Sequence, residues 1–140
     1  MRVSSRAIII ENGKVLTMFR RKIKDGVVKE YYVIPGGGQD DGETLEQNVK
    51  RELKEELNVE IKILGYLGNE IAVETNSNYF HCEITNGTPQ LGGEELGRMT
   101  EENYYEPRYI EIDKLNEIDL FGKEFVYKAL NKEYVLNNKI

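Results

Sequence analysis

The sequence is poor in the residues that build disulfide frameworks and histidine sites. Cys82 is the only cysteine among 140 residues, which excludes an internal disulfide and favours a reducing, cytoplasmic environment. We interpret its thiol as a small residue of the core or a strand rather than as a nucleophile. His81 is the only histidine, and we interpret it as a hydrogen-bonded structural residue rather than as a base or a metal ligand.

Long apolar runs and an excess of positive charge are missing as well. No run approaches the roughly 18 residues of a membrane span, and the apolar block Ala7–Ile10 is too short for the core of a signal peptide. The 19 Lys and Arg residues oppose 25 Asp and Glu residues, which gives a formal charge of −6. This balance disfavours binding to a nucleic acid polymer or to an anionic membrane. We therefore expect a soluble, cytoplasmic protein, in which an anionic ligand needs a metal ion and a few placed Lys or Arg residues.

The length and the hydrophobic content of 39% indicate one domain spanning residues 1–140, large enough to bury about two-thirds of its unfolded surface. β-rich segments predict strands at residues 3–10, 15–21, 31–34, 59–67, 70–74, 79–85 and 107–112. Asn12-Gly13 is a strong hairpin signal between the first two strands, Gly65 suggests a bulge, and residues 75–78 read as a turn. A final amphipathic helix is expected over residues 123–136, with these side chains inward: Phe125, Val126, Ala129 and Leu130.

The central stretch of the chain is Gly36 to Val59, GGGQDDGETLEQNVKRELKEELNV. It begins with three glycines, passes through an acidic turn and continues as a predicted helix that ends at about Leu57. Thr44 or Asp41 is expected to cap the first turn, and Asn58 is expected to take the left-handed conformation that closes the helix.

This predicted helix has an apolar and an acidic face that overlap. At about 100° per residue, one arc carries Leu45, Val49, Leu53 and Leu57, and a second carries Glu52, Glu55 and Glu56. Glu56 projects between two of the apolar residues, so it is expected at the border of the core. Three carboxylates beside an apolar seam repel one another, and a divalent cation such as Mg²⁺ or Mn²⁺ removes that cost. The alternative is a Glu-rich helix face that is simply solvated.

Spacing within this stretch resembles the signature of the Nudix hydrolases, of the MutT-like kind. Gly37 is followed by five residues, Glu43, seven residues and then the run from Arg51 to Val59. Every specified position matches except Asn58, where the motif has glycine, and Asn is the best non-glycine residue for a positive φ. The resemblance implies an α+β fold, the Nudix α/β/α sandwich with a mixed central sheet. It also implies metal-dependent hydrolysis of a pyrophosphate bond in a nucleoside diphosphate linked to another group.

The resemblance also assigns roles to the motif residues. Glu52 and Glu56 would bind Mg²⁺ or Mn²⁺, and Glu55 would bind a metal ion or activate water. Arg51 would orient a neighbouring carboxylate, and Gly36 would offer its carbonyl to the metal.

The resemblance gives structural roles to two motif residues and leaves the identity of the general base open. Glu43 would be structural through an ion pair, as Gly37 would be through its place in the motif. Which carboxylate serves as general base varies within the family. A base from outside the motif is also possible, with Glu106 as the first candidate and Glu70 as the second.

Substrate contacts are expected outside the motif. The basic run from Arg20 and Arg21 through Lys22 and Lys24 is either a solvated loop before Gly26 or a phosphate contact. The long segment 86–106, expected to be irregular, is a candidate substrate lid. Aromatic residues that would stack on a base, unless they belong to the core, are Tyr32, Phe80, Tyr104 and Tyr105.

The preferred substrate is a nucleoside triphosphate, split to monophosphate and pyrophosphate. Some members of the family carry a proline or tyrosine that marks hydrolysis of ADP-ribose or dinucleoside polyphosphates, but Val73–Asn76 occupy that interval here. ADP-ribose or a nucleotide sugar is the alternative substrate, and a non-catalytic nucleotide-binding module is the alternative function. A homodimer is plausible by resemblance.

Overall fold

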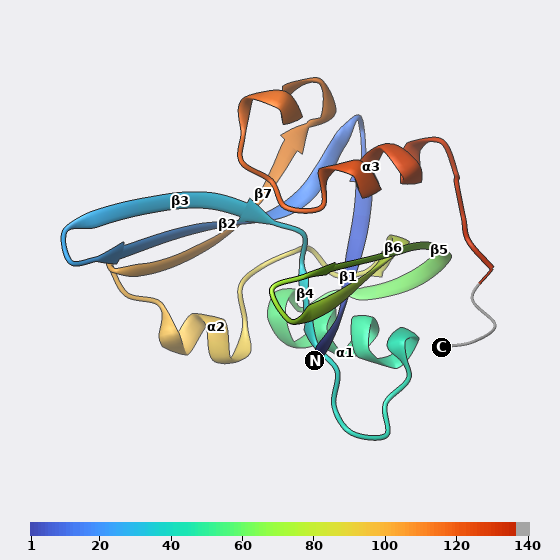
Figure 1. Ribbon diagram of the computed structural model, residues 1–140, viewed down its shortest axis with the longest axis horizontal. Coiled ribbons are helices and arrows are strands. Elements are labelled where there is room, and N and C mark those ends of the chain that lie inside the picture. Colours follow the sequence, from blue (N-terminus) through green and yellow to red (C-terminus); the bar gives the residue numbers. More distant parts are fainter. Residues whose placement is uncertain (137–140) are drawn as a thin grey trace.

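The computed structural model describes residues 1–136, with only the backbone described at residues 93–95. Its elements, in chain order, are β1 (Arg2–Glu11), β2 (Lys14–Lys24), β3 (Val27–Val33), β4 (Gly36–Gly38), α1 (Leu45–Leu57), β5 (Glu60–Ala72), β6 (Thr75–Asn86), α2 (Gly93–Arg98), β7 (Asn103–Glu111), the 3₁₀ helix η1 (Ile112–Glu117) and α3 (Lys123–Leu130) (Figure 1). Within residues 1–136, no helix is both long enough and apolar enough to cross a membrane.

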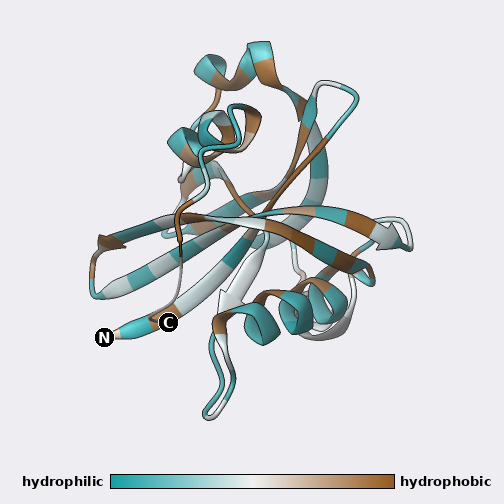
Figure 2. Cartoon of the chain, turned by 90° about the vertical axis from the view of Figure 1, so that its right-hand side faces the viewer, coloured by the Kyte–Doolittle hydropathy of each residue, from teal (hydrophilic) through white to brown (hydrophobic). Residues whose placement is uncertain are grey.

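The strands form a mixed sheet in the order β3-β2-β1-β6-β5, with β4 paired to β1 and β7 paired to β2. β1 and β6 run parallel, and the other pairs run antiparallel. α1 and α3 lie on opposite faces of the strands (Figures 1 and 2). This arrangement confirms the predicted α+β sandwich.

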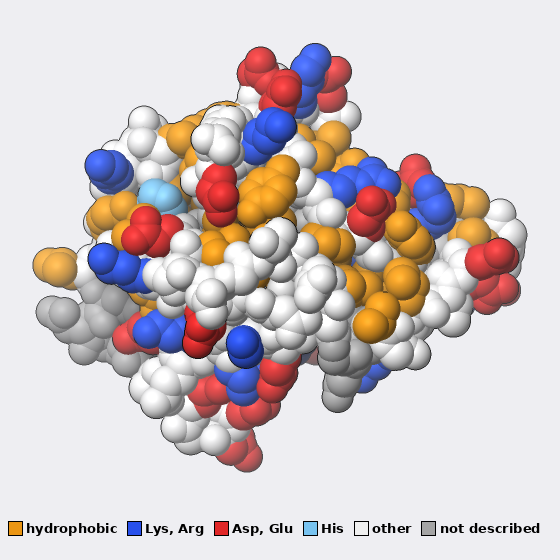
Figure 3. Space-filling view, turned by 180° about the vertical axis from the view of Figure 1, so that it is seen from behind, with side chains coloured by type: hydrophobic (Ala, Val, Ile, Leu, Met, Phe, Trp, Pro, Cys, Tyr) orange, Lys and Arg blue, Asp and Glu red, His pale blue; other side chains and the backbone are white. Residues whose placement is uncertain are grey.

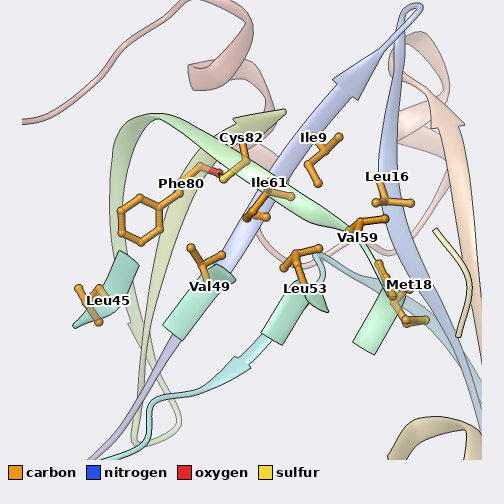
Figure 4. Close-up of a cluster of buried hydrophobic side chains, with 12 residues drawn as sticks. Ile9, Leu16, Met18, Leu45, Val49, Leu53, Val59, Ile61, Phe80 and Cys82 are labelled. Carbon is orange, nitrogen blue, oxygen red and sulfur yellow. Dashed lines mark hydrogen bonds between the residues drawn. The ribbon is translucent and has the colours of Figure 1, made fainter. Parts of the chain in front are cut away.

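Two apolar clusters fill the spaces on the two faces of the sheet. The cluster beneath α1 contains Leu45, Val49, Leu53 and Leu57 of the helix. Figure 4 shows the first three of these beneath Ile9, Phe80 and Cys82 of the sheet, which belong to the same cluster. The cluster beneath α3 contains Phe125, Val126 and Ala129, packed with residues that include Ile8, Leu67 and Tyr79. Burial raises the pKa of the Cys82 thiol well above its usual range, as expected for a core residue rather than a nucleophile.

Both ends of α1 follow the prediction. The Thr44 side chain accepts a hydrogen bond from the Gln47 amide at 3.1 Å, and the Gln47 side chain accepts one from the Thr44 amide at 2.9 Å. This reciprocal capping box satisfies two amides that the helix itself cannot pair. At the other end, Asn58 takes the left-handed conformation with φ 57° and ψ 35°.

The hairpins follow their turn residues in two of three cases. Asn12 (φ 53°) and Gly13 (φ 74°) form the predicted two-residue turn between β1 and β2. The chain reverses at Gly26 as expected, but in a tight turn of Asp25 (φ 51°) and Gly26 (φ 77°) instead of a longer loop, so both flanking strands are longer than predicted. Asp-Gly is itself a strong signal for this turn type. β3 therefore begins at Val27 instead of residue 31, and the β2–β3 hairpin projects from the body (Figure 1).

The predicted turn at residues 75–78 is wrong. Residues 60–72 form the single strand β5, and the chain reverses at Val73 (φ 46°) and Glu74 (φ 62°) before β6 begins at Thr75. Neither residue favours a positive φ, so propensity alone pointed to the Asn-rich segment that follows. The bulge at Gly65 is confirmed by a register shift between Ile63 and Gly65.

The segment expected to be irregular, 86–106, is partly regular, since it contains α2 and the start of β7. Pro107 lies inside β7 rather than at its beginning, directly opposite Met18 of β2. Proline is tolerated there because β2 is the only strand that pairs with β7 among residues 1–136, so an edge position needs no second amide donor.

The final helix is shorter than predicted, and it ends at Leu130 instead of residue 136. Leu130 is 44% exposed instead of facing inward, whereas Phe125, Val126 and Ala129 are buried as expected. Lys132 takes a positive φ of 52°, and the chain then turns back toward β5, where the Val135 amide donates to the Tyr66 carbonyl at 2.7 Å. Tertiary contacts with β5 therefore replace the last helical turns.

His81 has the structural role that its isolation in the sequence suggests. Its Nδ1 lies 2.9 Å from the Tyr134 hydroxyl, and the Tyr134 ring covers Gly65, where a Cβ would lie 2.5 Å from the ring. Burial, helped by the charge of Lys132, lowers the pKa of His81. The side chain surfaces on the rear face of the molecule, beside hydrophobic side chains (Figure 3).

The β5–β6 turn provides a test of this topology. Val73 is 96% exposed, so its replacement sacrifices no packing, whereas a left-handed conformation costs a non-glycine residue about 1–2 kcal/mol. We expect Val73→Asn/Glu74→Gly to raise the free energy of unfolding by about 1 kcal/mol in urea denaturation. The reverse exchange at the β1–β2 turn, Asn12→Val/Gly13→Glu, is the control and lowers it. Unchanged or reduced stability of the first variant would contradict the turn.

Candidate active site

The glycine segment is a short strand held flat against β1. β4 pairs with Ser4, Ser5 and Arg6 of β1, and a Cβ on Gly36 would collide with the Ser5 carbonyl oxygen and lie 2.7 Å from the Arg6 Cα. On the other side of β4, a Cβ on Gly37 would lie 2.5 Å from the Glu52 carboxylate. Glycine is therefore required at position 36, where backbone atoms of β1 would collide with a side chain, whereas a side chain at position 37 would have to displace the Glu52 carboxylate.

Arg51 joins the acidic turn, the glycine strand and the helix. Its Nε and Nη2 donate to the two carboxylate oxygens of Glu43 at 2.7 and 3.0 Å, a bidentate pair. Nη2 also donates to the Gly38 carbonyl at 2.9 Å. Nη1 donates to Glu52 at 3.1 Å and to Glu55 at 3.0 Å. One guanidinium thus fixes the relative positions of three glutamates and one carbonyl.

The charges in this network stabilise one another. The hydrogen bonds from Arg51 hold the pKa of Glu43 below its ordinary value, against an opposing effect of burial. The same bonds, with the charge of Glu52, raise the pKa of Arg51 above its usual range. Glu43 is therefore an ion-paired residue, in the arrangement that the family resemblance implies for it.

The three motif glutamates line one cavity but differ in exposure. The side chains of Glu52 and Glu55 are 17% and 60% exposed, and Glu56 as a residue is only 7% exposed. The position of Glu56 at the border of the core follows from its place between apolar neighbours on α1.

The cavity has a volume of about 880 Å³ and combines both signs of charge. Acidic side chains come from Asp40, Glu52, Glu55 and Glu56, and basic ones from Arg2, Arg6, Arg20, Arg51 and Arg98. Its wall also includes the three glycines of β4 and the rings of Tyr31 and Tyr105. The arginines make the cavity suitable for an anionic ligand, although the chain as a whole is acidic.

The ligand atoms available in the cavity are of the kinds that bind a divalent metal ion. Carboxylate and carbonyl oxygens are the ligands that Mg²⁺ and Mn²⁺ prefer, and Glu52, Glu55, Glu56 and the β4 backbone supply both kinds. Within residues 1–136, no group of three or more acidic, histidine or cysteine side chains is gathered closely enough to hold an ion as it stands. Arg51 Nη1 pairs with both Glu52 and Glu55 in this arrangement. A bound ion would compete with this guanidinium for the same oxygens.

Among the predicted substrate contacts, the structure brings Arg20 and Tyr105 into the cavity. The Arg20 guanidinium carbon lies 4.1 Å from the centre of the Tyr105 ring, and the two residues face each other across β2 and β7. Arg21 alternates to the opposite face of the sheet, where its Nε donates to Glu30 at 2.8 Å. Of the four residues of the predicted basic run, only Arg20 therefore lines the cavity.

The remaining predicted aromatic contacts lie outside the cavity. Tyr32 packs against the cluster beneath α3, and Phe80 is buried in the cluster beneath α1. Tyr104 packs edge-on against Phe19, with ring centres 6.3 Å apart.

Neither predicted external base lines the cavity. Glu106 accepts a hydrogen bond from Arg108 at 2.8 Å on the sheet face opposite Tyr105. Glu70 shares a hydrogen bond with Glu124 of α3, which raises the pKa of Glu70. These positions do not support a role for either residue as the base.

Several residues of the cavity wall were not identified from the sequence: Arg2, Arg6, Tyr31 and Arg98. Arg2 and Arg6 belong to β1 and approach the site because β4 pairs with that strand. Arg98 lies in α2, within the segment proposed as a lid. Only Tyr31 could have been identified from the sequence, because neighbouring residues of a strand point to opposite faces and one of Tyr31 and Tyr32 must therefore face the site.

Comparisons with known proteins agree with this geometry. The chain matches the NUDIX domain over residues 1–126. No curated protein matches it. Among solved structures, a MutT NUDIX hydrolase from Burkholderia pseudomallei is similar with a TM-score of 0.68 and 18% identity, over 92% of this chain and 97% of that chain.

Two other similar structures have different described activities. An ADP-ribose pyrophosphatase from Streptococcus suis 89-1591 has a TM-score of 0.63 and 18% identity, over 99% of this chain and 96% of that one. A UDP-X diphosphatase has a TM-score of 0.66 and 18% identity, over 94% of this chain, which spans 64% of that protein. At this identity the likeness concerns the fold. Because the NUDIX match extends over residues 1–126, the chain belongs to the Nudix family of pyrophosphohydrolases.

Proposed function

We propose that the protein hydrolyses a pyrophosphate bond in a nucleoside diphosphate linked to another group, with Mg²⁺ or Mn²⁺ bound by the motif. The observation that carries the proposal is the shared cavity, in which Glu52, Glu55 and Glu56 face the glycine strand and several arginines. Carboxylates for a cation and guanidinium groups for phosphates are the two requirements of phosphoryl transfer.

The metal site would be formed by Glu52, Glu56 and the Gly36 carbonyl, with Glu55 as a further ligand or as the base that activates water. A bound divalent cation neutralises phosphate charge and lowers the pKa of bound water. Arg51 holds Glu52 and Glu55 through Nη1 and is itself anchored by Glu43. Glu55 has the most exposed of these carboxylates, which suits it to accept a proton from water and pass it to solvent.

The substrate we favour is a nucleoside triphosphate, cleaved to a monophosphate and pyrophosphate. A cavity of about 880 Å³ is large enough for a nucleotide. Arg20, stacked on Tyr105, lies within the same cavity and provides a cationic and aromatic surface for the phosphates or the base. ADP-ribose and nucleotide sugars are the alternative substrates, because known proteins of the same fold include hydrolases named for them.

The proposal predicts metal-dependent turnover within a panel of nucleoside triphosphates, ADP-ribose, nucleotide sugars and dinucleoside polyphosphates. Product release is measured with Mg²⁺, Mn²⁺ or EDTA, using phosphatase-coupled and pyrophosphatase-coupled assays. We expect the triphosphates to be the best substrates. A preference for ADP-ribose or a nucleotide sugar would retain the chemistry and replace the substrate.

In the same panel, Glu56→Gln is expected to lower turnover by more than tenfold, because it removes one anionic oxygen from the metal site. Glu46→Gln is the matched control, since Glu46 lies exposed in the first turn of α1 and does not line the cavity. Circular dichroism checks that both variants are folded. A rate for Glu56→Gln above a tenth of the wild-type rate would contradict its role as a ligand. Nucleotide binding without any turnover would favour the non-catalytic module.

The Arg51–Glu43 pair predicts a pH dependence of stability. The folded pKa of Glu43 lies below its ordinary value of 4.5, so the native state binds fewer protons than the unfolded state between the two values. The stabilisation is therefore complete above about pH 4.5 and is lost as the pH falls through the folded pKa. We expect Glu43→Gln to lower the free energy of unfolding by about 1–2 kcal/mol at pH 7, with a smaller difference at pH 3.

Urea denaturation between pH 3 and pH 7 measures this difference. Glu30→Gln is the control, because the Glu30–Arg21 pair is more exposed on both sides and is expected to contribute under about 1 kcal/mol. A pH-independent difference between wild type and Glu43→Gln would contradict the assignment.

A further inference from the structure

Asn48 is a polar residue on the face of α1 that also carries Arg51 and Glu52. It lies in the first turn of the helix beside Val49, and it is completely buried. Its Nδ2 donates to the Gly38 carbonyl at 3.0 Å and to the Gly37 carbonyl at 3.2 Å. Asn48 therefore connects α1 to two consecutive carbonyls of the glycine strand.

The oxygen of the Asn48 side-chain amide accepts no hydrogen bond from the residues that the structure describes. This atom, Oδ1, is buried. A buried oxygen without a donor is unfavourable. The hydrogen bonds of the Asn48 side chain are therefore made by its NH₂ group, which donates to two carbonyls of β4.

The register of β4 shows what these bonds control. The Ala7 amide donates to the Pro35 carbonyl and the Gln39 amide donates to the Val3 carbonyl, so Ser5 and Gly37 form the hydrogen-bonded pair between them. The Gly36 and Gly38 carbonyls then point away from β1. Gly38 uses its carbonyl to accept from Asn48 and Arg51, and the Gly36 carbonyl lies on the same edge of the strand.

Spacing along α1 places Asn48 in line with the site. Asn48, Arg51 and Glu52 occupy positions i, i+3 and i+4 and therefore share one helix face. The Glu52 carboxylate leaves no room for a side chain on Gly37. A change in the separation of β4 and α1 would therefore shift the Gly36 carbonyl relative to Glu52, and functional sites tolerate shifts of only about 0.5 Å.

We propose that Asn48 is a positioning residue that clamps the carbonyl edge of β4 onto α1 and thereby sets the Gly36 carbonyl relative to the Glu52 and Glu56 carboxylates. The inference rests on the proposed metal-dependent function. It assigns Asn48 no contact with substrate. Its effect is transmitted through the backbone of Gly37 and Gly38.

The test compares Asn48→Ala and Asn48→Leu with Val126→Ala. Leucine has the branched outline of asparagine without its donors and is somewhat larger, so Asn48→Leu loses the hydrogen bonds without leaving a cavity, whereas Asn48→Ala loses both the bonds and the volume. Val126 is fully buried on the α3 side of the sheet, so its truncation destabilises the fold without touching β4. Amide exchange of Gly37, the glycine that forms the hydrogen-bonded pair with Ser5, is measured by NMR without metal, and Mn²⁺ affinity is measured by electron paramagnetic resonance without substrate. The kcat and KM values are measured at a temperature where all variants are folded.

Both Asn48 variants are expected to exchange faster at the Gly37 amide, to bind Mn²⁺ about tenfold more weakly and to lose about tenfold in kcat with little change in KM. Val126→Ala is expected to keep its Mn²⁺ affinity within about twofold of wild type, since truncation there leaves the clamp intact. Equal Mn²⁺ affinity in the Asn48 and Val126 variants, or unchanged exchange at the Gly37 amide, would overturn the inference. A wild-type protein that binds no Mn²⁺ and turns over no substrate would instead overturn the proposed function, and with it the role of the clamp.

Discussion

The guanidinium of Arg51 is the interaction on which the site depends. Its Nε and Nη2 donate to the two carboxylate oxygens of Glu43, and Nη2 also donates to the Gly38 carbonyl. The remaining nitrogen, Nη1, donates to Glu52 and Glu55. Without this cation, the glutamates of α1 would repel one another beside an apolar core. Hydrogen bonds from one guanidinium therefore join the acidic turn, the glycine strand and the helix, and the proposed metal site lies where these three segments meet.

Much of this unit could be predicted because it is local in sequence. Helix periodicity placed Glu56 at the border of the core, and the capping residues at Thr44 and Asn58 behave as their chemistry requires. The same is true of the Asn12-Gly13 turn, where both residues take a positive φ. In each case a few neighbouring residues determine the conformation, so no knowledge of the tertiary structure is needed.

The rest depends on partners that are distant in sequence. Arg20 lines the cavity and Arg21 does not, because the register between β2 and β7 decides which face each side chain takes. The Val73-Glu74 turn opposes the conformational preferences of its own residues, and only the pairing of β5 with β6 explains it. Asn48 has no recognisable signal either, since its partners are carbonyls of a strand that pairs with β1.

The central claim is that water attacks a phosphorus atom of a bound pyrophosphate in the cavity beside Glu52 and Glu56. Its most direct test is a reaction with a nucleoside triphosphate in ¹⁸O-labelled water, with the products analysed by mass spectrometry. We expect one ¹⁸O atom in either the monophosphate or the pyrophosphate when Mg²⁺ or Mn²⁺ is present, and no product with EDTA. If the metal-loaded protein leaves every substrate class of the panel intact and unlabelled, the proposed hydrolysis is contradicted.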